Sequence, residues 1–342
     1  MKTAVKNFSS RPSGSISWAI QFLFFAGIFA TVGLSARAAT NTDWPLKNFD
    51  RLLISVPEAT LRINGEAGAK TLRVSLQESA AEDFEVQLNG ARLEIHPKAE
   101  IDKESFGQVS AKKRVIEITG APVALEVHIF SGQVQLSDWS KDSLIHVQKG
   151  KVLARNGSAA LVAHVQNGEL MVLDHQGKLN ADTYKATVQI KSLTGDADIE
   201  SFLGDTQIDR AKGFLSLKQG QGSSKIVNSS GTLQFELTKG VLNSQGFNGR
   251  VEGQTQEGPV NITVDGDSDV NVKSQSGRVT IRPSSKSGAW LNVTSAEGDI
   301  YGPSYMRVSR EGSQKSLRGR LRGDVQKGSI VVRSQDGVIV IR

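Results

Sequence analysis

Apolar residues recur at every second position through most of this chain, in short runs separated by glycines. From Gly132 to Gly258 twelve glycines keep a strict period, because each of them is nine or eighteen residues from the next. They are Gly132, Gly150, Gly168, Gly177, Gly195, Gly204, Gly213, Gly222, Gly231, Gly240, Gly249 and Gly258. Most are followed by apolar residues at offsets of two and four, as in Val134 and Leu136. Such offsets indicate strands, since alternate side chains of a strand point to the same side.

A strand this short can bury its apolar side only when many such units stack into a continuous core. Two nine-residue half-turns make a coil of about 18 residues, and neighbouring coils lie about 4.8 Å apart. The pattern therefore predicts an all-β protein, a short-coil parallel β-solenoid with two strand faces. The calcium-binding nonapeptide roll is not expected, because its turns need paired glycines and an aspartate, and turns such as Gly168-Glu169-Leu170 lack them.

The rest of the chain is organised around these repeats. Residues 45–129 keep the strand alternation without the nine-residue period, which predicts an irregular β-rich N-terminal cap over the edge of the first coil. The β-solenoid repeats are predicted over residues 130–302, followed by a polar loop at 303–316 and closing solenoid strands at 317–342.

Residues 1–38 have the features of a signal peptide. Basic residues precede an apolar run at 18–34, and Ala36-Arg37-Ala38 gives a small-x-small cleavage pattern. The run has 17 residues, about 25 Å as a helix, which is shorter than the roughly 30 Å of a bilayer core. We expect cleavage and export to the periplasm or the outer cell surface of a bacterium, with membrane contact only through an uncleaved signal. The chain has no cysteine and is disulfide-free.

The chain resembles a known family. It combines irregular N-terminal strands, a Gly-x-Val-x-Val ladder, a late polar loop and a final Gly-Ser-Ile-Val-Val-Arg-Ser-Gln-Asp-Gly-Val-Ile-Val-Ile. In these features it is similar to the bacterial putative-adhesin β-solenoid family of unknown function (domain of unknown function 4097). The likeness covers residues 49–342. It implies an envelope-associated β-solenoid and brings no catalytic residues with it.

Three histidines keep the period of the coil. His128, His146 and His164 are 18 residues apart, and Asp182 continues the series. Imidazole and carboxylate are ligands for zinc or copper, so a metal-binding module on this histidine ladder is one interpretation. Three rungs span about 9.6 Å, however, whereas nitrogens on one tetrahedral zinc are about 3.3 Å apart. We favour a half-exposed polar column without a cofactor.

Positive charge gathers near the C-terminal end. From Tyr301 onward the chain has nine basic and three acidic residues. Their net charge of +6 equals the net charge of the whole chain. Arg318, Arg320 and Arg322 alternate, so on a strand they would share one face and could bind phosphates or anionic sugars. An anionic surface polymer or envelope component is the expected partner. Nucleic acid is not expected, because the chain has no recognised nucleic-acid-binding module. The sequence predicts no particular oligomeric state.

The sequence contains no cysteine nucleophile, H-E-x-x-H, G-x-S-x-G or P-loop motif. It favours a non-catalytic exported cell-envelope protein whose rigid β-solenoid presents a face for surface adhesion or polymer binding. One alternative is a periplasmic scaffold that assembles end to end through an uncapped terminus near Ile339. The others are the metal-binding module and a polysaccharide-active enzyme with a site built from distant residues.

Overall fold

A computed structural model describes residues 40–98, 114–265, 268–324 and 327–342. All of them belong to one compact unit, Ala38–Arg342. Residues 1–39, which include the predicted signal peptide, lie outside the described part of the chain. Among the described residues, helices are limited to η1 (Leu46–Asn48) and α1 (Ala80–Asp83), and none is long and apolar enough to cross a membrane.

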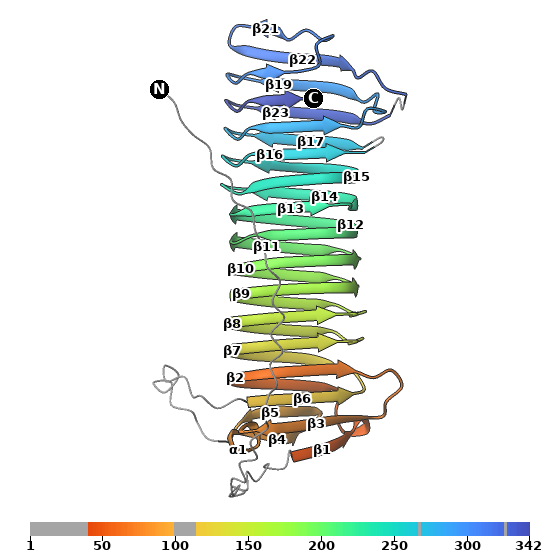
Figure 1. The fold of residues 1–342 in the computed structure, drawn as a ribbon, viewed down its shortest axis with the longest axis vertical. Helices are drawn as coiled ribbons and strands as arrows, with labels where there is room; N and C mark the ends of the chain where they lie inside the picture. The colour runs from red at the N-terminus through yellow and green to blue at the C-terminus, as the bar shows by residue number, and fades with distance from the viewer. Residues whose placement is uncertain (1–39, 99–113, 266–267, 325–326) are drawn as a thin grey trace, which may run out of the picture. The chain divides into compact units, whose positions relative to one another are not determined.

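The coils of this unit stack in parallel (Figure 1). In each coil the chain runs along one sheet, bends and returns along a second sheet. β7 (Ala124–Ser137) shows the period of 18 residues, because Val127 pairs with Ile145 and Val134 with Val152 of β8 (Ser143–Arg155). We call the sheet that contains residues 124–129 face A and the sheet that contains residues 131–137 face B. The predicted parallel β-solenoid is confirmed.

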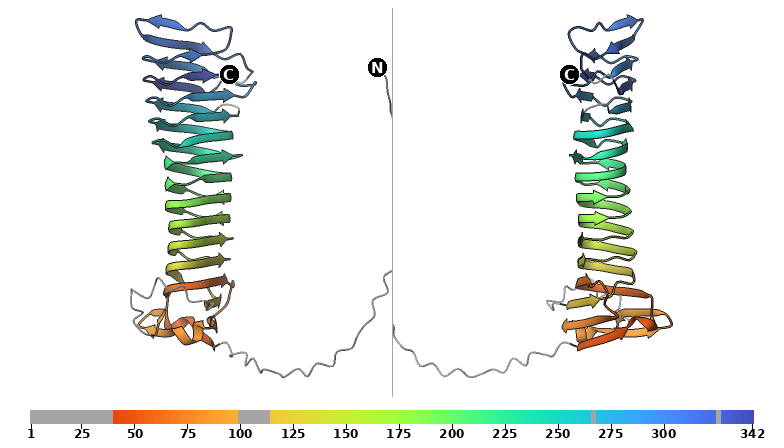
Figure 2. Two further views of the ribbon diagram at one scale, coloured as in Figure 1. Left: turned by 60° about the vertical axis from the view of Figure 1, so that its left-hand side comes forward. Right: turned by 90° about the vertical axis from the view of Figure 1, so that its right-hand side faces the viewer.

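The same path continues through the middle of the chain, and Figure 2 shows this stack from two further sides. The strands are β9 (Leu161–Gln176), β10 (Leu179–Thr194), β11 (Ala197–Leu203), β12 (Thr206–Gln221), β13 (Ser223–Val227), β14 (Ser230–Leu237), β15 (Val241–Thr255), β16 (Val260–Val264), β17 (Asp269–Ser274) and β18 (Val279–Pro283).

Glycine is required where the backbones of successive coils touch. Gly150 has a φ of +150°, and a Cβ added to it would lie 1.8 Å from the carbonyl oxygen of Gly132. Gly168 meets Gly150 in the same way, also at 1.8 Å. No side chain fits in such a gap, and few residues other than glycine adopt this φ. The nine-residue period of the sequence therefore records close backbone stacking.

The opposite bend combines glycines, such as Gly177 and Gly195, with a second column of residues of positive φ. Asp138, Asn156, Asp174, Ser192, Arg210 and Asn228, each 18 residues after the last, have φ between 50° and 57°. Asn and Asp tolerate this left-handed conformation better than most residues, because their short polar side chains can bond locally. The glycine pattern therefore marks this bend only from Gly177 onward and does not reveal the left-handed residues beside it.

The core is one narrow strip between the two faces. On face A the inward column includes Ile145, Ile199, Leu217 and Phe235, all buried. Burying each such side chain stabilises the fold by about 1.5–3 kcal/mol. Phe235 fits because the next rung carries Gly253, where a Cβ would lie 2.5 Å from the Phe235 ring.

Parallel stacking begins before residue 130. β2 (Arg51–Gly65) pairs with β7 along almost its whole length, so β2 is itself a coil of the stack. The strands beyond it pair in both directions. β5 (Arg92–Pro97) and β6 (Arg114–Gly120) pair with β2 in parallel, while β3 (Thr71–Glu78), β4 (Phe84–Asn89) and β1 (Thr40–Pro45) add antiparallel edges.

The C-terminal strands are not at the end of the stack. β23 (Ser329–Ser334) lies between β17 and β19 (Trp290–Ser295), and β24 (Ile339–Ile341) lies between β18 and β20 (Ile300–Tyr301). The inward side chains of β23 and β24 are apolar and buried, so a position with neighbours on both sides suits them.

The end of the stack is formed by residues predicted to be a polar loop and a closing strand. β22 (Gln314–Arg320) pairs with β19 in antiparallel fashion, and the short β21 (Ser309–Glu311) pairs with β22. β22 is polar on its outer side and contributes Leu317 to the core. End-to-end assembly would need an uncapped terminus near Ile339. The prediction of such a terminus is wrong, because Ile339 is fully buried inside the stack.

Candidate functional site

The predicted histidine column lies on face A. β7, β8 and β9 place His128 opposite His146 and His146 opposite His164, and β10 adds Asp182 opposite His164. The imidazole rings are stacked, with centroids 4.9 Å apart for the first pair and 4.4 Å apart for the second. Their planes differ by only 5° and 8°.

Both ends of the histidine stack are bound to carboxylates. The Nε2 atom of His128 is 2.9 Å from Oε1 of Glu126, and Nδ1 of His164 is 3.3 Å from Oδ2 of Asp182. The hydrogen bond with His128 lowers the pKa of Glu126. Burial lowers the pKa of the central His146, and the neighbouring His164 and His128 lower it further. Both effects favour the neutral form of His146.

The stacked geometry bears on the metal-binding interpretation, which stays a prediction. The nitrogen lone pairs of an imidazole lie in the plane of its ring, and the planes of His128, His146 and His164 are nearly parallel, so the lone pairs of all three do not converge on one point. In the part of the chain that the structure describes, no group of three or more His, Cys, Asp or Glu residues is arranged to hold a metal.

The same column leads into a groove on face A. Beyond Asp182 it continues through Glu200 to Lys218, Glu236, Gln254 and Lys273 on successive rungs. Two hollows, of about 350 and 510 Å³, lie over these last rungs on either side of the column and share Glu236, Gln254 and Lys273, and we call the two together the groove. A ligand lying along the stack would meet one outward side chain of this column about every 4.8 Å.

Amide side chains dominate the lining of this groove. They are Gln234, Gln254, Gln256, Asn271, Gln275 and Gln335. Each amide can both donate and accept hydrogen bonds. The groove is therefore suited to a ligand with many hydroxyl or amide groups.

Three of the four charged residues that line the groove contact neighbouring side chains. Glu252 forms an ion pair with Arg250, and Glu236 accepts a hydrogen bond of 3.2 Å from Gln254. Lys218 lies 3.5 Å from Glu200 across one rung. These contacts hold the side chains in position along the groove.

The arginines predicted to bind anions lie at the far end of the stack. β22 includes Arg318 and Arg320, both exposed, but ends before Arg322. The guanidinium carbon of Arg322 lies 4.2 Å from the centre of the Tyr305 ring. The structure therefore brings Arg318 and Arg320 to one strand face and places Arg322 on an aromatic ring beside it.

A family model described as Toastrack DUF4097 matches residues 49–341. The chain belongs to this family. The match spans all the described coils of the Toastrack stack together with most of the irregular N-terminal strands. No curated protein sequence matches the chain.

Three solved structures are similar to this Toastrack chain. A putative cell adhesion protein from Clostridium sporogenes ATCC 15579 has 10% identity and a TM-score of 0.21, covering 89% of this chain and 99% of its own. A putative adhesin from Bacteroides fragilis NCTC 9343 has 13% identity, a TM-score of 0.28 and coverages of 90% and 98%. A putative lipid binding protein from Parabacteroides distasonis ATCC 8503 has 18% identity, a TM-score of 0.33 and coverages of 72% and 96%.

The sequence did not reveal the groove of this Toastrack protein. The column from His128 could have been extended beyond Glu200 by adding 18 each time, which reaches Lys218, Glu236 and Gln254. The next coil is one residue longer, because Gln254 pairs with Lys273. Gln275 and Gln335 come together only because β23 is inserted beside β17, which the spacing does not indicate.

Proposed function

We propose that this Toastrack chain is a non-catalytic, exported cell-envelope protein that binds a surface polymer along face A. The observation that carries the proposal is the open, amide-lined groove over Glu236, Gln254 and Lys273. A polysaccharide strand has hydroxyl groups at regular intervals, which suits a row of amides repeated from rung to rung. Because the rungs are fixed by parallel stacking, the groove needs little rearrangement to bind.

The same groove supports a binding role over a catalytic one. General acid–base catalysis needs a group that can exchange protons with the substrate at the reacting atom. Two carboxylates line the groove. Glu236 accepts a hydrogen bond from Gln254, and Glu252 forms an ion pair with Arg250. The groove is also open along its length, whereas catalytic sites usually exclude water.

Export is supported by the basic start, the apolar run at 18–34 and the cleavage pattern Ala36-Arg37-Ala38. An envelope location would bring the groove close to polysaccharides. The absence of cysteine makes the fold independent of the redox state of its compartment.

Removing two groove amides is expected to weaken polymer binding. The Gln254→Ala/Gln275→Ala double variant loses two hydrogen-bonding side chains, each contributing about 1 kcal/mol net, so the affinity should fall about 25-fold. The measurement is retention of the full chain in native gels containing dextran or an unbranched β-glucan, together with pelleting on purified peptidoglycan.

The matched control is Gln189→Ala/Gln207→Ala, which removes two amides from adjacent rungs of face B. This variant should bind like the unchanged protein. The proposal fails if none of the three polymers is bound, or if the face A and face B variants lose the same affinity.

A further inference from the structure

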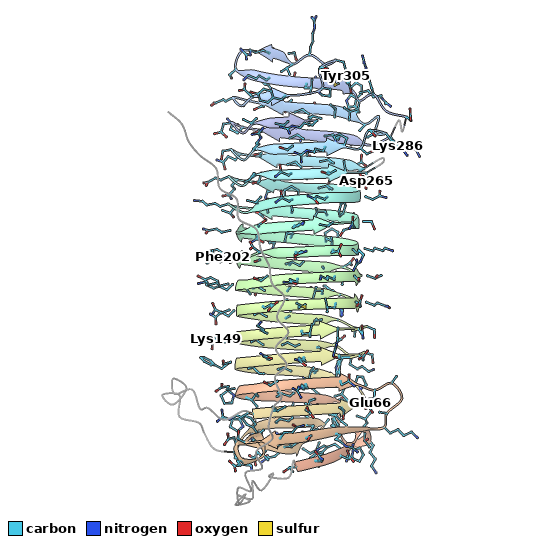
Figure 3. The ribbon with its side chains drawn as sticks, viewed as in Figure 1. Glu66, Lys149, Phe202, Asp265, Lys286 and Tyr305 are labelled. Atoms are coloured by element: carbon cyan, nitrogen blue, oxygen red, sulfur yellow. The ribbon has the colours of Figure 1, made fainter. Side chains whose placement is uncertain are left out.

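The end of the stack at β22 has an outer surface unlike that of the coils. We call residues 303–322, together with Trp290, the tip. Its exposed large side chains include Trp290, Tyr305 and Val308, which are 49%, 40% and 40% exposed. Figure 3 places Tyr305 at the β22 end of the stack.

The tip is a formed cap over the last coil. Leu317 of β22 is fully buried, and a Cβ on Gly302 would lie 2.4 Å from its side chain. Met306 packs over Gly319, where a Cβ would lie 2.5 Å from the Met306 methyl group. The loop before β21 therefore covers the open end of the core and presents its remaining side chains outward.

The exposed ring of Tyr305 is held in place from two sides. Its hydroxyl accepts a hydrogen bond of 3.1 Å from the backbone N–H of Arg322, and the Arg322 guanidinium lies over its face. Trp290 is paired with Arg320 across β19 and β22. Each exposed aromatic ring of the tip thus has an arginine as its neighbour.

Residues 303–322 are strongly cationic. They contain one acidic residue, Glu311, and six basic ones: Arg307, Arg310, Lys315, Arg318, Arg320 and Arg322. Their net charge of +5 is almost the whole net charge of the chain, which is +6. Lys315 is bound to Asp299 below the tip, whereas Arg318 and Arg320 are exposed on the outer side of β22.

We propose that the tip docks on the surface of a lipid bilayer that contains anionic lipids. Arginine binds phosphate groups through two parallel hydrogen bonds, and each basic residue near an anionic bilayer adds to binding. Tyrosine and tryptophan favour the interface between headgroups and acyl chains, and a small apolar residue such as Val308 can enter it. A protruding cap reaches a bilayer plane, whereas an extended polymer is better held by a groove.

This docking would engage only the last strands of face A, β19 and β22, and leave the groove open. The groove lies over β14, β15 and β17, and β23 and β19 separate it from β22. Lipid binding by the tip therefore does not depend on polymer binding by the groove, and each proposal can fail alone.

The test uses the full chain, which is free of cysteine. A Ser304→Cys variant carries an environment-sensitive fluorophore at an exposed tip position. With phosphatidylcholine vesicles containing about one third phosphatidylglycerol, its emission should shift to the blue, and high salt should reverse the shift. Because the fluorophore reports its own surroundings, binding through another part of the chain leaves its emission unchanged.

Neutralising the arginines should remove this response. Each charge is worth about fivefold in affinity, so Arg318→Gln/Arg320→Gln/Arg322→Gln in the Ser304→Cys chain should bind about one-hundredfold more weakly. If this variant does not fold, Arg307→Gln/Arg310→Gln in the loop takes its place and should bind about 25-fold more weakly. The same fluorophore at Gln148→Cys, in the middle of the stack, should not respond.

Three results would overturn the proposal. They are an equal response with vesicles of phosphatidylcholine alone, an equal response at position 148, and unchanged vesicle affinity in the folded arginine variants. Binding of soluble polyphosphate without binding of the vesicles would assign the tip to a free polyanion and would also overturn it.

Discussion

The Gly150→Ala variant is expected to lose at least about 3 kcal/mol of stability or to fail to fold. The added methyl group would lie 1.8 Å from the carbonyl oxygen of Gly132, so two coils would have to move apart. The φ of +150° adds backbone strain, because residues with a Cβ rarely adopt it. Separating the coils would also weaken the backbone hydrogen bonds between β7 and β8.

The measurement is urea unfolding, combined with hydrogen exchange of the central coils. Exchange is needed because stacked repeats can open locally without unfolding everywhere. Gly68→Ala is the matched control, since Gly68 has a φ of +78° and a Cβ added there meets nothing within 4 Å. It should cost only about 1 kcal/mol. Equal losses in the two variants would contradict the role assigned to close backbone stacking.

The Trp139→Ala variant is expected to lose about 3–5 kcal/mol, because it leaves a large cavity in a narrow core. Trp139 is only 2% exposed, and its indole N–H donates a hydrogen bond of 3.0 Å to the carbonyl oxygen of Val123. Removing the ring would also leave that carbonyl without its partner. Trp139 lies at the bend that follows β7, so the loss should appear in the first coils.

The Trp290→Ala variant is the control, because it removes an exposed tryptophan where Trp139→Ala removes a buried one. Trp290 is 49% exposed on β19, and its removal should cost less than about 1 kcal/mol. Trp139→Phe should be intermediate, since it keeps most of the buried ring and loses the hydrogen bond. Urea midpoints of the three variants test this order, and a Trp290→Ala loss as large as that of Trp139→Ala would contradict it.

The coil could be predicted from the sequence because its cause is local and repeated. Each glycine that meets the backbone of the previous coil leaves a mark at a fixed interval, as at Gly132 and Gly150. The coil formed by β2 could not be recognised from the glycine period, because Ala59 stands opposite Gly132 where the period would place a glycine. The bends at Asp138 and Asn156 escaped it because Asp and Asn there take the left-handed conformation in place of glycine.

The order of the last coils could not be predicted in the same way. The Ile330 to Val332 pattern of β23 is like that of any other coil, and every coil can stack on every other. Its insertion between β17 and β19 depends on which pairing buries the most apolar surface, which is a property of the whole stack. The antiparallel pairing of β22 has no periodic signal either.

At the candidate site, too, the repeated features could be predicted and the others could not. The register of His128, His146 and His164 followed from the spacing of 18, and the structure places them in one column. The ring orientation was not predictable, because it comes from stacking between imidazoles, and it separates the lone pairs that a metal would need. One lining residue of the groove, Gln335, could not be placed because it follows the inserted β23.

The measurement that tests this account most directly is the location of the protein in cells, since a polymer-binding role requires the envelope. Cells producing the chain with an epitope tag after Arg342 are fractionated, and protease is added to intact cells and to cells with an opened outer membrane. The account predicts a chain shortened by about 38 residues outside the cytoplasmic membrane, cleaved in one of these two conditions. A chain that retains Met1 and stays protected until the cytoplasmic membrane is broken would contradict it.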